Sequence, residues 1–218
     1  GAGVSPDNHN LILPMFSPMA QPPTKRYRTI VADPPWRYGQ AGGYSWRKGR
    51  PSGEARPMTP YPSMAAEEIL ALPVGNWADE RSHLYLWTTQ RYLEDALTIA
   101  KGWGFEVRKI LIWCKAPTGF SMGGAFGNST EFIVTGVRGN LSYQNRVPRD
   151  WFEWKRGTHS EKPNAFYDLV QHMSIGPYLD VFARKQRMGW DCFGNEAYNP
   201  SELLATLTDE QAEGLVPA

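Results

Sequence analysis

The sequence has few cysteines, no metal-binding pattern and no long apolar run. Its two cysteines, Cys114 and Cys192, have no CxxC partner, which excludes a disulfide framework and favours a reduced intracellular protein. The four histidines are scattered without the spacing of metal ligands, so we expect no metal site. Because no signal peptide or apolar span is present, we expect a soluble, cytoplasmic protein that does not bind membranes.

The sequence also lacks a charge excess of either sign. The 218 residues carry a formal net charge of +1, so any contact with nucleic acid must come from local basic patches. The length suits one domain with a substantial core. We expect an irregular arm over residues 1–26, the folded domain over 27–198 and an extra helix over 199–218.

The four residues Asp33-Pro34-Pro35-Trp36 organise the rest of the chain. They follow a short apolar run, residues 28–32, that is typical of a buried strand. Because Pro34 cannot donate a ladder hydrogen bond, the strand should end at Asp33, and ligands of open α/β sheets gather at such strand ends. Asp33 and the Pro34 carbonyl can accept hydrogen bonds from an exocyclic amine, and Trp36 can stack on a flat ring. The motif therefore predicts a site for an amino-bearing base.

Strands and helices alternate along the remaining chain. Apolar runs indicate strands over 83–89, 107–115, 131–139 and 178–184, and helices are expected over 65–72, 91–103 and 164–173. The strand, helix and strand of residues 83–115 have the spacing of a right-handed parallel crossover. We therefore predict an α/β fold whose mostly parallel sheet carries helices on both faces.

Two long segments without such periodicity, residues 37–60 and 140–158, combine cations with aromatic side chains. Cations suit phosphates and rings suit bases, so we expect both segments to contact nucleic acid. The alternative is that they are mobile, solvated loops. The basic residues that we assign to the substrate are Arg47, Lys48, Arg50, Arg146 and Arg149.

The tetrapeptide resembles the catalytic motif of the MT-A family of S-adenosylmethionine-dependent N6-adenine methyltransferases. That family includes the catalytic subunit of the mRNA N6-adenosine methyltransferase and many bacterial and phage relatives. Further segments similar to the family occur in matching order, so that the resemblance covers about residues 27–198. They are Trp87-Thr88, Trp103-Gly104-Phe105, Trp113-Cys114-Lys115, His159-Ser160-Glu161-Lys162-Pro163, the segment from Tyr178 to Arg184, Gly189-Trp190 and Gly194-Asn195-Glu196.

The resemblance implies a Rossmann-like methyltransferase fold with circularly permuted motif order, S-adenosylmethionine as cofactor and S-adenosylhomocysteine as product. Lys162 would then pair with the methionine carboxylate and Arg184 would reach the ribose. Asn195 and Glu196 would meet ribose hydroxyls and the adenine edge. The full cofactor set is Asp33, Ser160, Lys162, Asp180, Arg184, Asn195 and Glu196. Besides the five basic residues, the substrate set contains Tyr61, Trp87, Trp113 and Lys115.

Three departures from the family pattern affect the cofactor contacts. Asp180 stands where the family usually has Glu, so a ribose contact there would be weaker or mediated by water. The segment Lys185-Gln186-Arg187 also differs from the mRNA enzyme, and no acid before the tetrapeptide matches the family residue that contacts the cofactor adenine.

The activity that we expect is methyl transfer to the exocyclic N6 of adenine. DNA is favoured over RNA, because the chain is compact and has no counterpart of the extra RNA-binding regions of the eukaryotic enzyme. Two alternatives stay open: a non-catalytic nucleic-acid-binding partner, and an enzyme acting on cytosine N4 or a small molecule. A homodimer also stays open.

Overall fold

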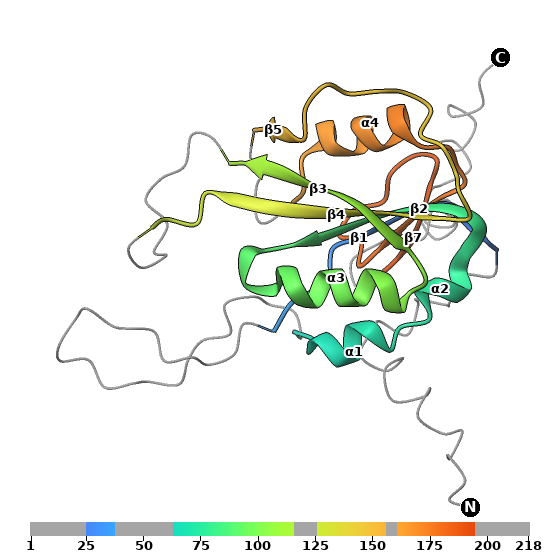
Figure 1. Cartoon of the computed structure of the whole chain (residues 1–218), viewed down its shortest axis with the longest axis horizontal. Helices are drawn as coiled ribbons and strands as arrows, with labels where there is room; N and C mark the ends of the chain where they lie inside the picture. Colours follow the sequence, from blue (N-terminus) through green and yellow to red (C-terminus); the bar gives the residue numbers. More distant parts are fainter. Residues whose placement is uncertain (1–24, 38–62, 116–125, 156–160, 195–218) are drawn as a thin grey trace, which may run out of the picture.

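The computed structural model describes residues 25–37, 63–115, 126–155 and 161–194, which fold around one seven-stranded sheet (Figure 1). The strand order is β5-β3-β4-β2-β1-β6-β7. The strands are β1 (Tyr27–Ala32), β2 (Ala78–Thr88), β3 (Glu106–Cys114), β4 (Thr130–Arg138), β5 (Trp151–Glu153), β6 (Tyr178–Val181) and β7 (Trp190–Phe193). The helices are α1 (Ala66–Leu70), α2 (Val74–Trp77), the 3₁₀ turn η3 (Gln90–Tyr92), α3 (Leu93–Gly102) and α4 (Asn164–Met173).

The sheet is mostly parallel, as the sequence predicted. β1 pairs in parallel with β2 and β6, β6 with β7, and β3 with β5. The exception is β4, which lies antiparallel between β2 and β3. β2, α3 and β3 therefore do form a crossover between two strands of the same direction, but those strands are not neighbours in the sheet.

Helices cover both faces of the sheet and create two cores. Figure 1 shows α1, α2 and α3 on one face and α4 on the other. Side chains alternate along each strand, so Ile30 of β1 lies in the core beneath α3, whereas Val31 lies in the core beneath α4. β2 repeats this alternation with Leu86 and Trp87. Full burial of each such side chain contributes about 1.5–3 kcal/mol.

Several local features differ from the sequence predictions. The helix expected over 65–72 ends earlier, and α2 follows it as a separate turn. β5 lies inside the segment 140–158 that was expected to be a loop, and β7, which contains Cys192, was not among the predicted strands. β6 ends at Val181 rather than at Arg184, because Phe182 adopts a left-handed conformation (φ 67°) and its N–H donates to the Phe193 carbonyl (2.6 Å).

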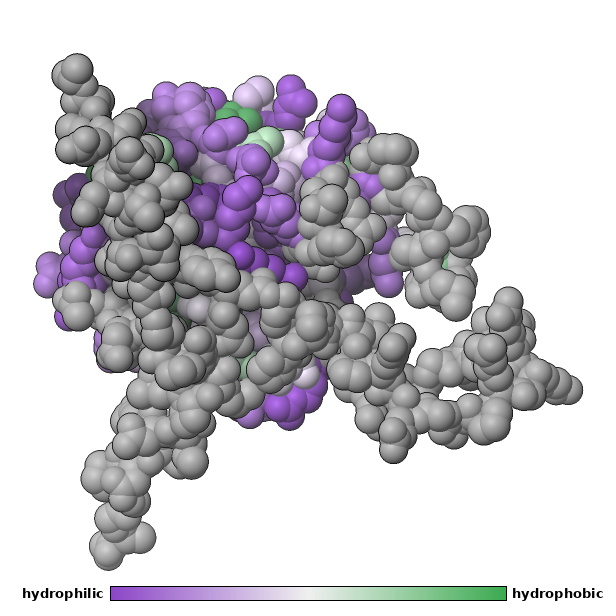
Figure 2. Space-filling view, turned by 180° about the vertical axis from the view of Figure 1, so that it is seen from behind, coloured by the Kyte–Doolittle hydropathy of each residue, from purple (hydrophilic) through white to green (hydrophobic). Residues whose placement is uncertain are grey.

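Several sequence predictions fall outside the described residues. They concern residues 1–24 of the arm predicted over 1–26, residues 38–60 of the segment 37–60, and the helix predicted over 199–218. None of the helices in the described ranges has the length and apolarity that spanning a bilayer requires. Where described residues are visible from the side opposite to Figure 1, hydrophilic side chains predominate (Figure 2).

Two glycines in left-handed conformations provide a matched test of backbone strain. A Cβ on Gly139 (φ 64°), which follows β4, would overlap the Glu80 carbonyl oxygen, whereas a Cβ on Gly189 (φ 79°) would meet no atom within 4 Å. Gly189→Ala should therefore lose only the conformational term of about 1–2 kcal/mol, and Gly139→Ala should lose clearly more. Urea unfolding of both variants measures the difference. Equal losses would contradict the proposed clash at Gly139.

Candidate active site

The tetrapeptide is held to the body of the protein by backbone hydrogen bonds on both sides. The Asp33 N–H donates to the Val181 carbonyl (3.2 Å), which fixes Asp33 between the carboxyl ends of β1 and β6. The Met64 N–H donates to the Pro35 carbonyl (2.7 Å), and the Met64 carbonyl accepts from the Arg37 N–H (2.9 Å). The prediction that the strand ends at Asp33 is confirmed, since β1 stops at Ala32.

Trp36 is a buried support and not the stacking surface that the sequence suggested. Its indole is 5% exposed, stacks on the Tyr92 ring (centroids 5.1 Å apart) and donates to the Trp87 carbonyl (3.2 Å). Its backbone N–H also donates to the Pro34 carbonyl (2.9 Å). That carbonyl oxygen therefore has one lone pair left for an amine.

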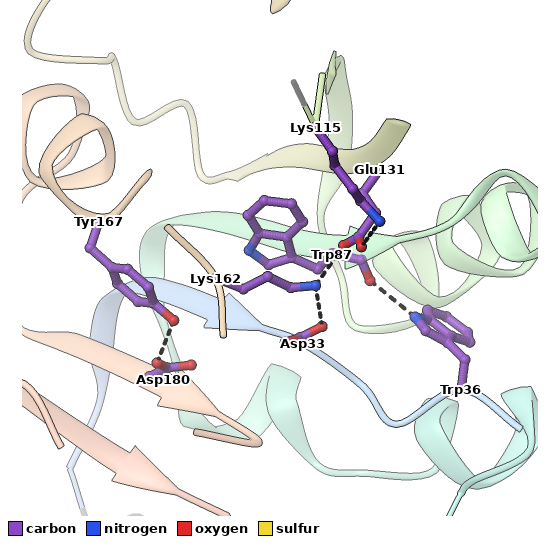
Figure 3. A network of polar contacts seen from close by, with 8 residues as sticks. All are labelled: Asp33, Trp36, Trp87, Lys115, Glu131, Lys162, Tyr167 and Asp180. Carbon is purple, nitrogen blue, oxygen red and sulfur yellow. Dashed lines mark hydrogen bonds and ion pairs between the residues drawn. The ribbon is translucent and has the colours of Figure 1, made fainter. Parts of the chain in front are cut away.

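Two carboxylates and two lysines form a continuous chain of ion pairs beside the tetrapeptide (Figure 3). Lys115 Nζ lies 2.5 Å from Glu131, Glu131 lies 2.6 Å from Lys162 Nζ, and Lys162 Nζ lies 3.2 Å from Asp33 Oδ1. The four side chains are only 12–16% exposed, and their formal charges cancel. They come from the end of β3, the start of β4, the segment before α4 and the end of β1.

The pKa values in this chain follow from burial and from the neighbouring charges. Burial raises the pKa of Asp33, although Lys162 opposes this rise. Burial would also raise the pKa of Glu131, but Lys162 and Lys115 together hold it below its usual value. Burial disfavours the charged form of Lys162, but Asp33 and Glu131 raise the pKa of Lys162 above that of a free lysine. Lys162 therefore stays charged, while Asp33 binds a proton more readily than an ordinary carboxylate.

Trp87 and Trp113 belong to the core, which corrects their assignment as substrate contacts. Trp87 is fully buried, and Lys162 Nζ lies 4.5 Å from its ring centroid. Trp113 is 3% exposed, packs edge-on against Trp87 and donates to the Trp154 carbonyl (3.0 Å). Neither indole is available for stacking on a base in this conformation. Lys115, also assigned to the substrate, lies at the site but is paired with Glu131.

A small cleft of about 20 Å³ lies beside Asp33 at the carboxyl end of β6. Asp180 is 3% exposed there and accepts a hydrogen bond from the Tyr167 hydroxyl (2.9 Å), and the Arg187 guanidinium lies 3.6 Å from the Tyr167 ring centroid. Burial raises the pKa of Asp180 to about 7, against the opposing effects of Tyr167 and Arg187. The residues lining the cleft are Asp33, Glu161, Lys162, Tyr167, Asp180, Phe182, Ala183, Arg184, Lys185 and Arg187.

The wall of this cleft depends on a close approach between two backbone segments. A Cβ on Gly194 would lie 2.8 Å from the Ala183 nitrogen and 2.9 Å from the Phe182 carbonyl carbon. Gly194 therefore lets the chain after β7 pack directly against the turn after β6. Arg184 follows this turn and lines the cleft, although it lies outside the strand that was predicted to contain it.

The structure thus brings together Asp33, Lys115, Lys162, Asp180 and Arg184 from the predicted set. Arg146 and Arg149 lie elsewhere, around a separate cavity. The predicted residues outside the described ranges are Arg47, Lys48, Arg50, Tyr61, Ser160, Asn195 and Glu196, and their roles stay predictions.

Two residues of the site were not singled out from the sequence. Glu131 is the first acid of β4 and becomes a partner of Lys162, which lies 31 residues further along the chain. Tyr167 lies on α4 beside two core aromatics, and only the fold shows that its hydroxyl reaches Asp180. For Glu131, the available signals were a glutamate at the start of an apolar strand and the similarity of this strand to the family pattern.

The MT-A70 family model matches residues 27–196. The chain belongs to the MT-A70 family. The match begins at the first residue of β1 and includes every strand of the sheet, the ion-pair chain and the cleft beside β6. The family resemblance of the tetrapeptide and the downstream segments is thereby confirmed.

Individual relatives of this MT-A70 chain fall into two groups. The type II methyltransferase M.MunI of Mycoplasma sp. is 30% identical over 200 residues, which are 84% of this chain and 83% of the relative. The N(6)-adenosine-methyltransferase MT-A70-like protein of Drosophila melanogaster is 26% identical over 182 residues. Human METTL3, an N(6)-adenosine-methyltransferase catalytic subunit, is 23% identical over 182 residues. The matched segment is 78% of this chain but only 27% and 28% of those two proteins.

The raised pKa of Asp180 should make stability depend on pH in a predictable direction. The unfolded chain releases this proton near 3.8 and the folded chain near 7, so the stabilising contribution of neutral Asp180 is lost as the pH rises through this window. Asp180→Asn keeps an acceptor for Tyr167 but cannot ionise. The variant should therefore gain stability relative to wild type between pH 4 and 7, and urea unfolding at several pH values measures this gain. A difference that does not change with pH would refute the buried neutral form.

Proposed function

We propose that this chain transfers a methyl group from S-adenosylmethionine to the exocyclic N6 of adenine in nucleic acid, with DNA as the favoured substrate. The observation that carries this proposal is the buried Asp33 carboxylate, fixed at the end of β1 and paired with Lys162 (3.2 Å). Family membership supports the same chemistry, because its named relatives are methyltransferases and several of them are N(6)-adenosine-methyltransferases.

Asp33 can increase the nucleophilicity of an aromatic amine, which is weak on its own. The lone pair of N6 is conjugated with the purine ring and is released only when the nitrogen becomes pyramidal. Lys162 binds Asp33 Oδ1, which leaves Oδ2 to accept one N6 hydrogen, and the remaining lone pair of the Pro34 carbonyl can accept the other. Such preorganised acceptors stabilise charge that develops during the transfer.

Asp33 is also suited to take the proton that the reaction releases. When bound, S-adenosylmethionine supplies a methyl group on a positively charged sulfur. The N6–methyl bond forms as the sulfur–methyl bond breaks, which would leave S-adenosylhomocysteine, and the cationic nitrogen must then lose one proton. Burial raises the pKa of Asp33, so its carboxylate can take this proton at Oδ2 and pass it to water.

The cleft beside Asp33 has donors and acceptors that fit the charged groups of this cofactor. The methionine ammonium needs hydrogen-bond acceptors, which the carboxyl oxygens of Asp33 and Asp180 supply. The methionine carboxylate needs a cation, as the sequence predicted for Lys162. An ammonium has three N–H donors, and Asp33 and Glu131 occupy two of them, so Lys162 retains one for that carboxylate.

DNA is favoured over RNA because of how much of each relative's length the match with this chain spans. The type II methyltransferase is matched over most of both chains, whereas the enzymes named for adenosine, a ribonucleoside, are matched over about a quarter of their length. The alternative of a non-catalytic partner is disfavoured by the tetrapeptide and by the lysine held against it. Incubation with labelled cofactor and DNA or RNA, followed by nucleoside mass spectrometry, tests the reaction and separates the two substrates.

Asp33→Asn should lower turnover by on the order of 10²–10³, because it removes the negative acceptor while preserving size. Cofactor affinity, measured by calorimetry with S-adenosylhomocysteine, should change much less. Asp168→Asn, at an exposed position of α4, is the matched control and should leave turnover unchanged. Turnover of Asp33→Asn within tenfold of wild type would remove Asp33 from the proposed role.

The pH dependence of turnover should report the charge balance around Asp33. The carboxylate must be ionised, so the rate should fall as the pH drops through its raised pKa. The Glu131 charge contributes to that rise and Lys162 opposes it. Glu131→Gln should therefore shift the acid limb of the rate profile to lower pH, and Lys162→Met should shift it to higher pH. Shifts in the same direction for both variants would contradict this assignment.

A further inference from the structure

A second cavity lies on the α4 side of the sheet and has no part in the proposed methyl transfer. It measures about 410 Å³ and is enclosed by β3, β4, the C-terminal half of α4 and the segment 143–152. This volume is typical of small-molecule sites. None of the residues lining the cleft beside Asp33 contributes to it.

The inner surface of this cavity suits a flat ring. Leu111, Leu169 and Met173 provide apolar walls, together with the aromatic rings of Tyr143 and Phe152. Each of these two rings has one face covered by a neighbour. Tyr143 stacks on His83, with centroids 4.1 Å apart, and Phe152 stacks on Trp154, at 4.7 Å. Since both rings also line the cavity, an aromatic ligand could extend either stack.

The rim of the cavity carries two cations that have no carboxylate partner among the described residues. Arg146 and Arg149 are exposed, and within the described ranges neither forms an ion pair, whereas the nearby Lys109 is paired with Asp150 (3.2 Å). The Arg149 guanidinium instead lies 5.8 Å from the centroid of the Trp151 ring. Unpaired guanidinium groups beside a cavity suit phosphate, whose oxygens match their planar set of donors.

We propose that this cavity binds one nucleotide unit, with its base against Tyr143 and Phe152 and its phosphate on Arg146 and Arg149. The same chemistry could come from a free nucleotide or from a nucleotide of the nucleic-acid substrate other than the target adenine. The second source rests on the proposed function, whereas the first does not. Base stacking on aromatic side chains contributes about 1–3 kcal/mol per base.

The bound nucleotide is not the methyl acceptor, because aromatic rings separate the cavity from Lys162. The rings form a series in which Phe152 stacks on Trp154, and the Trp154 and Phe166 centroids lie 6.1 Å apart. The Phe166 and Trp87 centroids lie 4.7 Å apart, and Lys162 Nζ lies over the Trp87 ring. A second nucleotide of the same strand, bound there, would fix the position of the strand relative to Asp33. This cavity would then contribute to the choice of sequence around the target.

Thymidine 5′-monophosphate is a suitable probe, because thymine has no exocyclic amine for Asp33. Calorimetry on the full chain should show binding, and the double variant Arg146→Ala/Arg149→Ala should weaken it by about tenfold or more. Val147→Trp, at a half-buried position of the lining, should block binding by filling the cavity. The control Arg81→Ala/Lys101→Ala removes the same charge from exposed positions outside the cavity and should have no effect. Thymidine without phosphate should bind wild type and the double arginine variant equally.

Titrations with single-stranded and duplex oligonucleotides separate the two sources. If the cavity variants weaken oligonucleotide binding, the nucleotide comes from the substrate; if they weaken only monophosphate binding, the ligand is a free nucleotide. The proposal is overturned if neither probe binds in a manner that depends on Arg146, Arg149 and Val147, or if the control variant loses as much affinity. Monophosphate binding without any methylation activity would reject the proposed function and leave the nucleotide site standing.

Discussion

One buried ammonium group determines the arrangement of the active site. Lys162 lies between Asp33 and Glu131, which would otherwise face each other as like charges removed from water. Leaving a buried ion unpaired costs several kcal/mol, so the lysine and the two acids can occupy this position only together. Because the three side chains come from segments far apart in the sequence, their pairing also fixes how those segments meet.

The antiparallel direction of strand β4 places the second acid, Glu131, at this site. Parallel strands present their carboxyl ends at one edge of the sheet, where Asp33 and Lys115 lie. β4 runs the other way, so its first residues pair with the last residues of β3, and Thr130 lies opposite Cys114. Glu131 thereby reaches the catalytic edge from the start of a strand. A purely parallel sheet would place that residue at the opposite edge.

Sequence reasoning located the site through residues whose local constraints are strong. Pro34 cannot continue a ladder, so the end of β1 at Asp33 was predictable. The direction of the Trp36 side chain was not, because an indole after two prolines can face a ligand or the core, and its contact with Tyr92 forms only in the fold. The partnership of Glu131 with Lys162 is likewise a long-range contact without a local pattern. β5 has three residues, too few to show a period, and the insertion of β4 between β2 and β3 depends on pairing across the whole sheet.

The short bridge between Trp36 and Met64 makes the position of Asp33 independent of the length of the chain between these two residues. The bridge places the two ends of the intervening chain side by side, so this chain is closed into a loop at its base. The entropic cost of closing such a loop grows slowly, by about 0.6 kcal/mol for each doubling of its length. Relatives could therefore exchange or lengthen this insert during evolution without displacing Asp33. In an engineered enzyme it is the natural place to graft another segment.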